Sequence, residues 1–407
     1  MSDFTTELKN RLADLRAQQL HRELRRVDSA PGSRIVINGQ TLLNFSSNDY
    51  LGLANHPALK EAALRTVRNF GAGAGASRLV CGSLAPFHEL EEALAAFKGT
   101  EAALTFATGY ATALGTITAL LGKDDIIIVD KLVHACIVDA AKLSGAKLRV
   151  FAHNDLDDLE AKLRWAGTQS GRALIVTESI FSMDGDAGPL REIVALKEKH
   201  GAWLLVDEAH ATGLYGPNHR GLAEELGVSH GIEIQMGTLG KALGASGGYI
   251  CGSRTLVDFL INRARSFIFS TAPVPAAAGA AMAAVRLVQS AEGQRLCATL
   301  WRRVEQGRTG IASVSDSFSH SSGTDNGAGR DVCPTPILPL ILGDESTAVS
   351  AATRLRDQGI FVPAIRYPTV ARGAARLRVT FTAAHTSADI QLLVQALDPT
   401  RKTQHVG

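Results

Sequence analysis

The chain has 407 residues, of which 45% are hydrophobic and 20% charged, and its formal net charge is +2. This composition is typical of a globular protein with a large core and excludes the fibrous and intrinsically disordered classes. Because the charges are balanced and no run approaches the length of a membrane span, we expect neither nucleic acid nor a membrane as a partner.

Residues 3–27 are rich in charge and have leucines at helical spacing, which predicts an N-terminal helix with one leucine-lined face. From about residue 100 to residue 252, short β-rich runs alternate with helical stretches. This alternation predicts an α/β fold with a mainly parallel sheet. The expected strands cover residues 103–106, 126–129, 148–151, 173–176, 203–206 and 248–251.

The pattern changes after about residue 285. A long helix comes first, and a Gly/Ser/Asp-rich stretch at 313–330 predicts a flexible surface loop. Strands near 337–342 and 376–381 flank a helix near 346–358. We therefore expect three parts: an N-terminal arm helix and strand over 1–45, a large α/β domain over 46–285, and a small C-terminal α+β domain over 286–407.

Polar residues follow several of the expected strands. Gly109 and Tyr110 come after the first strand, His134 after the second and Ser182 after the fourth, while Asp207 and His210 follow the fifth. Ligands of open α/β sheets bind beyond the carboxyl ends of the strands. We therefore expect these side chains to gather at one edge of the sheet.

Lys241 lies in the small-residue stretch G-T-L-G-K-A-L-G-A-S-G-G at 237–248. A nucleotide P-loop is excluded, because Gln235 stands where its first glycine is required and Ala242 replaces its Ser or Thr. Two interpretations remain at this point: a surface lysine in a flexible loop, or a lysine that forms a Schiff base with an aldehyde cofactor in a pocket cleared for a flat ring.

Other motifs carry weaker signals. The run Asp207-Glu208-Ala209-His210 occurs in DEAH-type helicases, but that motif works only with a P-loop. His134 and His210 lack the H-E-x-x-H spacing of a zinc helix, so we expect no metal. The G-A-G-A-G-A run at 71–76 follows a helical stretch, and a backbone turn near the site is a better interpretation than a dinucleotide loop.

Pyridoxal 5'-phosphate (PLP) accounts for the whole set. Its protonated ring nitrogen needs a buried carboxylate, which Asp207 supplies, and His134 would stack on the ring. His210 and Ser182 would hydrogen-bond the ring hydroxyl. The phosphate would bind the N–H groups of Gly109 and Tyr110 at a helix N-terminus. The remaining cofactor contacts expected are the hydroxyl of Thr238, which helps hold the phosphate, and Lys241, which forms the Schiff base.

The five cysteines are odd in number, widely scattered and without C-x-x-C spacing. This distribution indicates reduced thiols rather than disulfides or a zinc site. We expect the protein to be cytoplasmic.

Five segments resemble the α-oxoamine synthases. They are N-F-S-S-N-D-Y-L-G-L (44–53), H-N-D (153–155), F-S-M-D-G-D-x-x-P-L (181–190), V-D-E-A-H-x-T-G (206–213) and A-I-R-Y-P-T-V (364–370). The resemblance runs almost end to end. It implies a fold-type I PLP-dependent acyltransferase, a homodimer with active sites at the subunit interface, which joins an amino acid to an acyl thioester with loss of CO₂.

The resemblance also implies roles by position. Lys241, Asp207 and His134 match the catalytic lysine, the partner of the pyridinium and the stacking histidine. Thr271, next to Ser270, matches the segment through which the partner subunit reaches the phosphate. The residues expected to contact substrate are Arg22, Asn48, His134, Arg366, Thr369 and Arg378, of which Asn48 and Arg378 hold the amino-acid carboxylate.

Within the family, the pattern is most similar to the branch that joins L-alanine to pimeloyl-CoA or a pimeloyl carrier protein in biotin biosynthesis. Glycine C-acetyltransferase, 5-aminolevulinate synthase and serine palmitoyltransferase share much of it and stay open as alternatives. Arg25 or Arg26 could take the place assigned to Arg22, and Phe269 stands where the biotin enzymes often carry tyrosine. A catalytically inactive relative is disfavoured because Lys241 is present.

Overall fold

The computed structural model describes residues 3–314 and 333–398. These residues belong to two units, each described by itself. The large unit comprises residues 51–182 and 186–298, and the small unit comprises residues 1–50, 183–185 and 299–407. The three-part division expected from the sequence stays a prediction.

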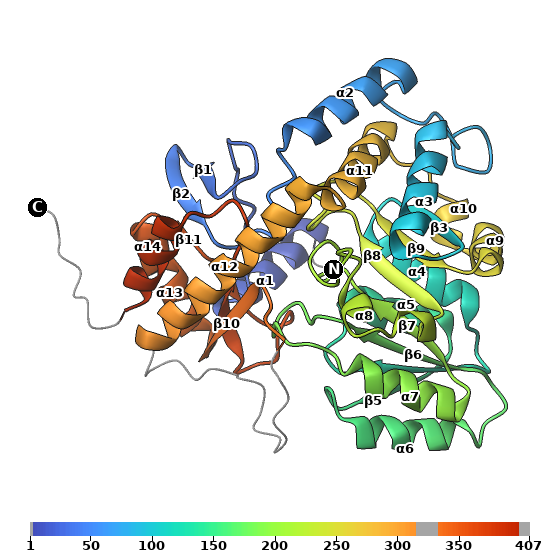
Figure 1. Ribbon diagram of the computed structural model, residues 1–407. Coiled ribbons are helices and arrows are strands. Elements are labelled where there is room, and N and C mark those ends of the chain that lie inside the picture. The colour runs from blue at the N-terminus through green and yellow to red at the C-terminus, as the bar shows by residue number, and fades with distance from the viewer. Residues whose placement is uncertain (1–2, 315–332, 399–407) are drawn as a thin grey trace, which may run out of the picture. The chain divides into compact units, whose positions relative to one another are not determined.

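A seven-stranded sheet in the order β3-β9-β8-β7-β6-β4-β5 forms the centre of the large unit (Figure 1). Its strands are β3 (Ala102–Phe106), β4 (Ile126–Asp130), β5 (Lys147–Phe151), β6 (Ala173–Glu178), β7 (Trp203–Asp207), β8 (Ile234–Thr238) and β9 (Gly248–Gly252). β9 is antiparallel to both of its neighbours, and the other pairings are parallel. Six strands therefore run in one direction, and the predicted mainly parallel sheet is confirmed.

Helices connect the strands and cover the sheet, and α6 and α7 lie together along one side of it (Figure 1). Those of the large unit are α2 (Pro57–Phe70), α3 (Ala85–Lys98), α4 (Gly109–Leu120), α5 (Ala135–Ser144), α6 (Leu156–Ala166), α7 (Leu190–His200), α8 (Leu222–Glu225), η1 (Ser229–Gly231), α9 (Arg254–Arg263), α10 (Arg265–Ile268) and α11 (Pro275–Val288). The side chains of Thr108, His134 and Asp155 cap the first turns of α4, α5 and α6. Such caps satisfy N–H groups that a helix start leaves unpaired.

Both faces of the sheet are buried. Ile127 and Val129 of β4 join an apolar cluster that includes side chains of α4, α5 and α9. Their neighbours Ile126 and Ile128, which point to the other face, are fully buried too. Continuous apolar strands of this kind are typical of parallel sheets covered by helices on both faces. The sheet edges, where strands end, are consequently where polar side chains can collect.

The small unit contains two three-stranded sheets, in the orders β1-β2-β11 and β10-β13-β12. Their strands are β1 (Arg34–Ile37), β2 (Gln40–Asn44), β10 (Ile337–Gly343), β11 (Ile360–Phe361), β12 (Ala364–Ile365) and β13 (Ala375–Thr380). Its helices are α1 (Phe4–Ala17), α13 (Glu345–Asp357) and α14 (Ser387–Leu397), and α12 (Ala291–Val314) continues into it from the large unit. The expected strands near 337–342 and 376–381 and the helix between them are present.

The N-terminal helix is shorter than the sequence predicts. It ends at Ala17 because Gln19 adopts a left-handed conformation with φ 56°, and the chain up to residue 27 is not helical. No residue of α1 is buried, so Leu8, Leu12 and Leu15 do not line a packed face within this unit. The predicted loop at 313–330 lies outside the described residues, apart from its first two positions in α12.

Candidate active site

The carboxyl ends of the parallel strands bring several predicted residues to one edge of the large unit. Asp207 is the last residue of β7, and Thr238 is the last residue of β8. Glu178 ends β6 and Asp130 ends β4. Gly109 begins α4, just after β3. Since these five strands share one direction, the edge predicted from the sequence exists.

Two acids lie side by side at the middle of this edge. Asp207 and Glu178 are direct partners in the register of β7 and β6 and are only 6% and 2% exposed. Burial raises the pKa of Asp207, and the nearby Lys241 opposes that rise. Burial and then the charge of Asp207 raise the pKa of Glu178 to about 8. Two buried acids without a cation between them are unfavourable, and a positively charged group bound here would offset this cost.

His134 stands at the N-cap of α5. Its Nδ1 accepts a hydrogen bond from the backbone N–H of Cys136 (3.2 Å) and lies 3.0 Å from the Cys136 thiol. Its own backbone N–H donates to Glu178 Oε1. Burial lowers the pKa of the His134 imidazole, and it raises the pKa of the Cys136 thiol to about 12. His134 is therefore neutral, with Nδ1 as an acceptor and the ring proton on Nε2.

Lys241 lies close to His210, as predicted. Its Nζ is 2.6 Å from His210 Nε2, and His210 is 4% exposed. The charge of Lys241 also influences the pKa values of Asp207, Glu178 and His134. The four predicted groups Lys241, His210, Asp207 and His134 thus occupy one electrostatic neighbourhood, and the interpretation of Lys241 as an isolated surface lysine does not fit.

The glycines around Lys241 serve different purposes. At Gly244, where φ is +60°, a Cβ would lie 2.5 Å from the backbone of Leu53 and Ala54, so a larger residue cannot fit. A Cβ at Gly237 would clash with the ring of Tyr249 at 2.4 Å. At Gly240 a Cβ would lie 3.5 Å from its nearest neighbour, so a larger residue would fit there. Of these three glycines, Gly240 is therefore the one that fits the expectation of cleared space beside the lysine.

The residues expected to hold the phosphate lie at the start of α4 and at the end of β8. The Thr238 hydroxyl donates to Gly247 O (3.0 Å) and accepts from Gly240 N (3.3 Å). A Cβ built on Gly109 would lie 4.0 Å from that hydroxyl, so the two residues are neighbours. The Tyr110 side chain, 47% exposed, donates its hydroxyl to Asp139 (2.7 Å). Free backbone N–H groups at a helix start favour an anion such as a phosphate.

Ser182 and Thr271, the other two residues expected to contact the cofactor, lie on segments other than those described above. Ser182 is half-buried in the turn that follows β6. Thr271 is exposed and forms an isolated β-bridge with Ser77. The neighbouring side chains of Val80, Phe269 and Val274 are 77%, 70% and 51% exposed. An exposed apolar patch of this kind is typical of a surface that another chain covers.

Apart from His134, the residues expected to bind substrate belong to the small unit. Arg378 of β13 donates from Nη1 to Asn48 Oδ1 (3.0 Å), and the Tyr50 hydroxyl lies 3.4 Å from the same oxygen. Arg378 is 6% exposed. The structure therefore brings together the two residues that were expected to share the amino-acid carboxylate.

Arg22 and Arg366 are also neighbours. Arg22 Nη2 donates to Tyr367 O (3.2 Å), while Arg366 donates to the carbonyl oxygens of Gln19 and His21. Burial and then the charge of Arg22 lower the pKa of Arg366, as expected where cations gather. Thr369 follows in the same turn, with its N–H bonded to Arg366 O (3.0 Å).

The two alternatives to Arg22 have other contacts. The Arg25 guanidinium lies over the Phe361 ring, 5.6 Å from its centroid. Arg26 pairs with Asp28 at 2.5 Å. These contacts favour Arg22 among the three arginines.

The side chains of the large unit fit pyridoxal phosphate. Asp207 would hold the ring nitrogen, and Lys241 would bond to the aldehyde. The start of α4 with Thr238 would take the phosphate, and His134 presents a flat neutral ring. In the described residues no group of three or more His, Cys, Asp and Glu side chains could hold a metal ion. None of the described helices is long and apolar enough to cross a membrane.

Sequence reasoning missed the contributions of two acids. Glu178 is the buried neighbour of Asp207 and accepts a hydrogen bond from the His134 backbone. Glu208 forms an ion pair with Lys98 (2.6 Å), and both side chains are 1% exposed. Only the alignment of strand ends could have signalled Glu178, and nothing local marks Lys98, which lies 110 residues from its partner.

Comparison with known proteins is consistent with these features. The family model for class I and II aminotransferases matches residues 40–397. The 8-amino-7-oxononanoate synthase of Geotalea daltonii is 46% identical over 408 aligned residues, which cover 100% of this chain and 98% of that protein. The enzyme of the same name from Geobacter sulfurreducens is 45% identical, with 97% of each chain covered.

Solved structures of the same family share the fold. Serine palmitoyltransferase from Sphingomonas wittichii has a TM-score of 0.88 at 29% identity and covers 98% of both chains. The serine palmitoyltransferase of S. paucimobilis, with the same score, identity and coverage, was solved with bound PLP. An 8-amino-7-oxononanoate synthase from Francisella tularensis has a TM-score of 0.72 at 27% identity, covering 88% of this chain and 97% of that one. The chain therefore belongs to the PLP-dependent α-oxoamine synthases within the class I and II aminotransferase family.

Proposed function

We propose that this protein is an 8-amino-7-oxononanoate synthase, which condenses L-alanine with a pimeloyl thioester and releases CO₂ and the free thiol. The observation that carries the proposal is the pairing of Lys241 with His210 on the sheet edge that also holds Asp207, in a chain 46% identical along its whole length to an enzyme of that name. The thioester is pimeloyl-CoA or a pimeloyl carrier protein.

Pyridoxal phosphate, when bound, supplies an aldehyde for attachment of the amino acid and a ring that withdraws electrons from its α-carbon. Lys241 is the base that takes the α-proton and later returns it. His210, 2.6 Å away, positions the Lys241 amine. Asp207 would hold the positively charged ring nitrogen of the bound cofactor, and that charge would oppose the rise that burial causes in the pKa of Asp207.

His134 contributes a neutral ring. Because the Cys136 N–H occupies Nδ1, the Nε2–H group is the donor that His134 can offer to a substrate oxygen. Protonation of Nδ1 would break the cap of α5, so the ring resists becoming a cation. His134 therefore acts as a hydrogen-bond donor and a stacking surface rather than as a proton carrier.

The small unit supports selection of the two substrates. The Arg378 guanidinium, buried and oriented by Asn48, suits a carboxylate such as that of alanine. Arg22 and Arg366 place two cations close together, which suits the carboxylate or ester at the far end of a pimeloyl chain. Acetyl and palmitoyl chains lack such a polar end.

We further propose that the protein works as a cytoplasmic homodimer. The exposed apolar patch around Thr271 supports a second subunit that covers it. None of the five cysteines, all of which lie in the described residues, forms a disulfide, and this suits a reducing compartment.

A panel of substrate pairs, followed by thiol release, tests the proposal. L-Alanine with pimeloyl-CoA is expected to react far faster than glycine with acetyl-CoA or serine with palmitoyl-CoA. A preference for glycine and a short acyl chain would move the protein to the acetyltransferase or aminolevulinate branch. A preference for serine and palmitoyl-CoA would move it to the palmitoyltransferase branch.

A further inference from the structure

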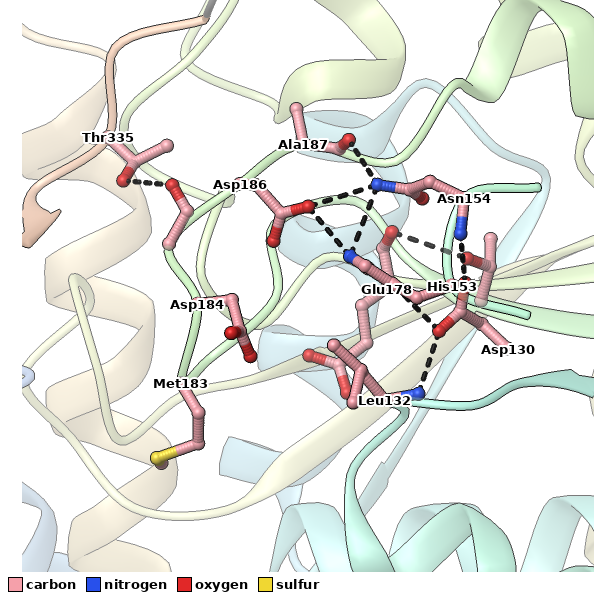
Figure 2. Close-up of polar contacts among 12 residues, drawn as sticks. Asp130, Leu132, His153, Asn154, Glu178, Met183, Asp184, Asp186, Ala187 and Thr335 are labelled. Atoms are coloured by element: carbon pink, nitrogen blue, oxygen red, sulfur yellow. Dashed lines mark hydrogen bonds and ion pairs between the residues drawn. The ribbon is translucent and has the colours of Figure 1, made fainter. Parts of the chain in front are cut away.

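His153, in the H-N-D segment after β5, bridges two aspartates. Its Nδ1 is 2.9 Å from Asp130 Oδ1, and its Nε2 is 2.7 Å from Asp186 Oδ2. Figure 2 shows the ring between these two carboxylates. The Phe181 ring packs edge-on against it, with 4.4 Å between the centroids.

Asn154 reinforces the same link. Its backbone N–H donates to Asp130 Oδ2 (2.9 Å), and its side-chain amide donates to Asp186 Oδ2 (3.0 Å) and Ala187 O (3.2 Å), as Figure 2 shows. Asn154 adopts φ 56°, the left-handed conformation that lets both of its donors face the two aspartates. The H-N-D segment thus contributes several hydrogen bonds to the two carboxylates.

Each aspartate belongs to a segment that carries a site residue. Asp130, fully buried, accepts the N–H of Leu132 (2.7 Å) and so holds the loop that ends at His134. Asp186 closes the turn that contains Ser182, because its carbonyl accepts the N–H of Phe181 (2.9 Å). Movement of either aspartate would therefore shift a group expected to face the cofactor.

Both ring nitrogens of His153 face a carboxylate oxygen, so both must donate and the ring must be a cation. Burial by itself would lower the pKa of His153, but the hydrogen bonds and charges of Asp130 and Asp186 raise it to about 10. In the described part of the chain, these two aspartates are the charged groups that hydrogen-bond the ring. The bridge is therefore intact at neutral pH and weakens as the pH rises toward 10.

We propose that His153 is a positioning residue of the active site, which ties the loop that carries His134 to the turn that carries Ser182. This inference rests on the proposed function, since it assumes that His134 and Ser182 face the bound cofactor. A small displacement of such groups is costly, because catalysis depends on geometry to within about 1 Å.

Three variants of the PLP-loaded protein test the proposal. His153→Ala removes the bridge, and His153→Gln keeps a side chain that can bond one carboxylate. The matched control is His200→Ala, which removes another half-buried histidine–carboxylate contact, that with Glu160, on α7. The measurements are the rate of PLP release on dialysis, the visible circular dichroism of the bound PLP, and kcat and KM for L-alanine.

We expect His153→Ala to release PLP about tenfold faster than the wild type. Residues that orient the direct ligands of a metal site have effects of this size on affinity. Its kcat should fall about 10- to 100-fold with KM little changed, since positioning rather than binding is lost. His153→Gln should be intermediate, and His200→Ala should stay within about twofold of the wild type. Nitrogen NMR of the wild type at pH 8 should show both ring nitrogens of His153 protonated.

The proposal is overturned if His153→Ala keeps the wild-type PLP release, dichroism and kcat, whatever its melting temperature. If His153→Ala does not fold, the test rests on His153→Gln. The proposal is then overturned if His153→Gln has the same PLP release, dichroism and kcat as His200→Ala. A neutral His153 ring at pH 8 does the same. A wild type that binds PLP but forms no product refutes only the proposed function, whereas one that binds no PLP refutes both.

Discussion

The two adjacent acids of the D-E-A-H run, Asp207 and Glu208, are expected to have different roles: the contacts of Glu208 support stability, whereas Asp207 supports turnover. Glu208 accepts the N–H of Ala223 (2.9 Å) and pairs with Lys98, which also donates to Arg220 O. These contacts make Glu208 a structural acid. The carboxylate of Asp207, next to it, accepts the N–H of Ala209 (2.9 Å) and forms no ion pair of this kind with a lysine among the described hydrogen bonds, which suits it to a cofactor.

The magnitude follows from the burial of the pair. Lys98 and Glu208 are each 1% exposed, so Lys98→Met leaves a carboxylate in the core without its cation. Breaking a buried pair in this way costs about 3–5 kcal/mol. Because Glu208 keeps one hydrogen bond, we expect about 3 kcal/mol. The double variant Lys98→Met with Glu208→Gln removes both charges and should recover most of this loss.

Urea denaturation followed by far-ultraviolet circular dichroism measures the stability, and product formation per bound PLP measures the chemistry. Lys98→Met should lose stability but keep turnover per folded site, whereas Asp207→Asn should keep stability and lose most turnover. The reasoning is refuted if Lys98→Met unfolds within about 1 kcal/mol of the wild type. It is equally refuted if Asp207→Asn turns over normally.

Three further outcomes are expected. Borohydride reduction of the yellow protein should leave the cofactor bonded to Lys241 on peptide mapping, and a Lys241→Ala protein that is still reduced at another lysine would contradict the assignment. Arg366→Ala should raise KM for pimeloyl-CoA about tenfold, because the loss of one charged hydrogen bond weakens binding by about that factor. The KM of a short acyl-CoA that lacks a terminal carboxylate should not change. Burial lowers the pKa of His385 from 6.5 to about 4, despite the opposing hydrogen bond to Asn44 O. Since the unfolded chain takes up this proton first, the stability that His385 contributes is present above pH 6.5 and is lost as the pH falls toward 4. The free energy of unfolding of the wild type should therefore fall by about 1.4 kcal/mol per pH unit in this range because of His385, and urea titrations of His385→Gln should lack this contribution. An unchanged pH dependence in His385→Gln would contradict this assignment.

Much of the large unit follows from local sequence. Its central strands are short apolar runs such as I-I-I-V at 126–129, because strands buried on both faces have no polar positions. The polar residues directly after these runs could then be placed at one edge. The N-terminal helix was predicted too long because the spacing of its leucines does not reveal the left-handed turn at Gln19.

The remaining features depend on contacts between distant residues. The neighbour of Asp207 is Glu178 because of the register of β6 and β7, which the sequence does not specify. The bridge from His153 to Asp130 and Asp186 requires the end of β4 and two separate loops to meet. The requirement for glycine at position 244 also depends on a distant segment, because a Cβ there would lie 2.5 Å from the backbone of Leu53 and Ala54.

The most direct test of the proposed chemistry is the fate of the alanine carboxylate. The purified protein is incubated with carboxyl-labelled L-alanine and pimeloyl-CoA, and labelled CO₂, free CoA and the aminoketone are quantified by mass spectrometry. Decarboxylative condensation predicts equal amounts of the three, with no label in the aminoketone. Release of CoA without labelled CO₂, or a product that retains the label, would contradict it.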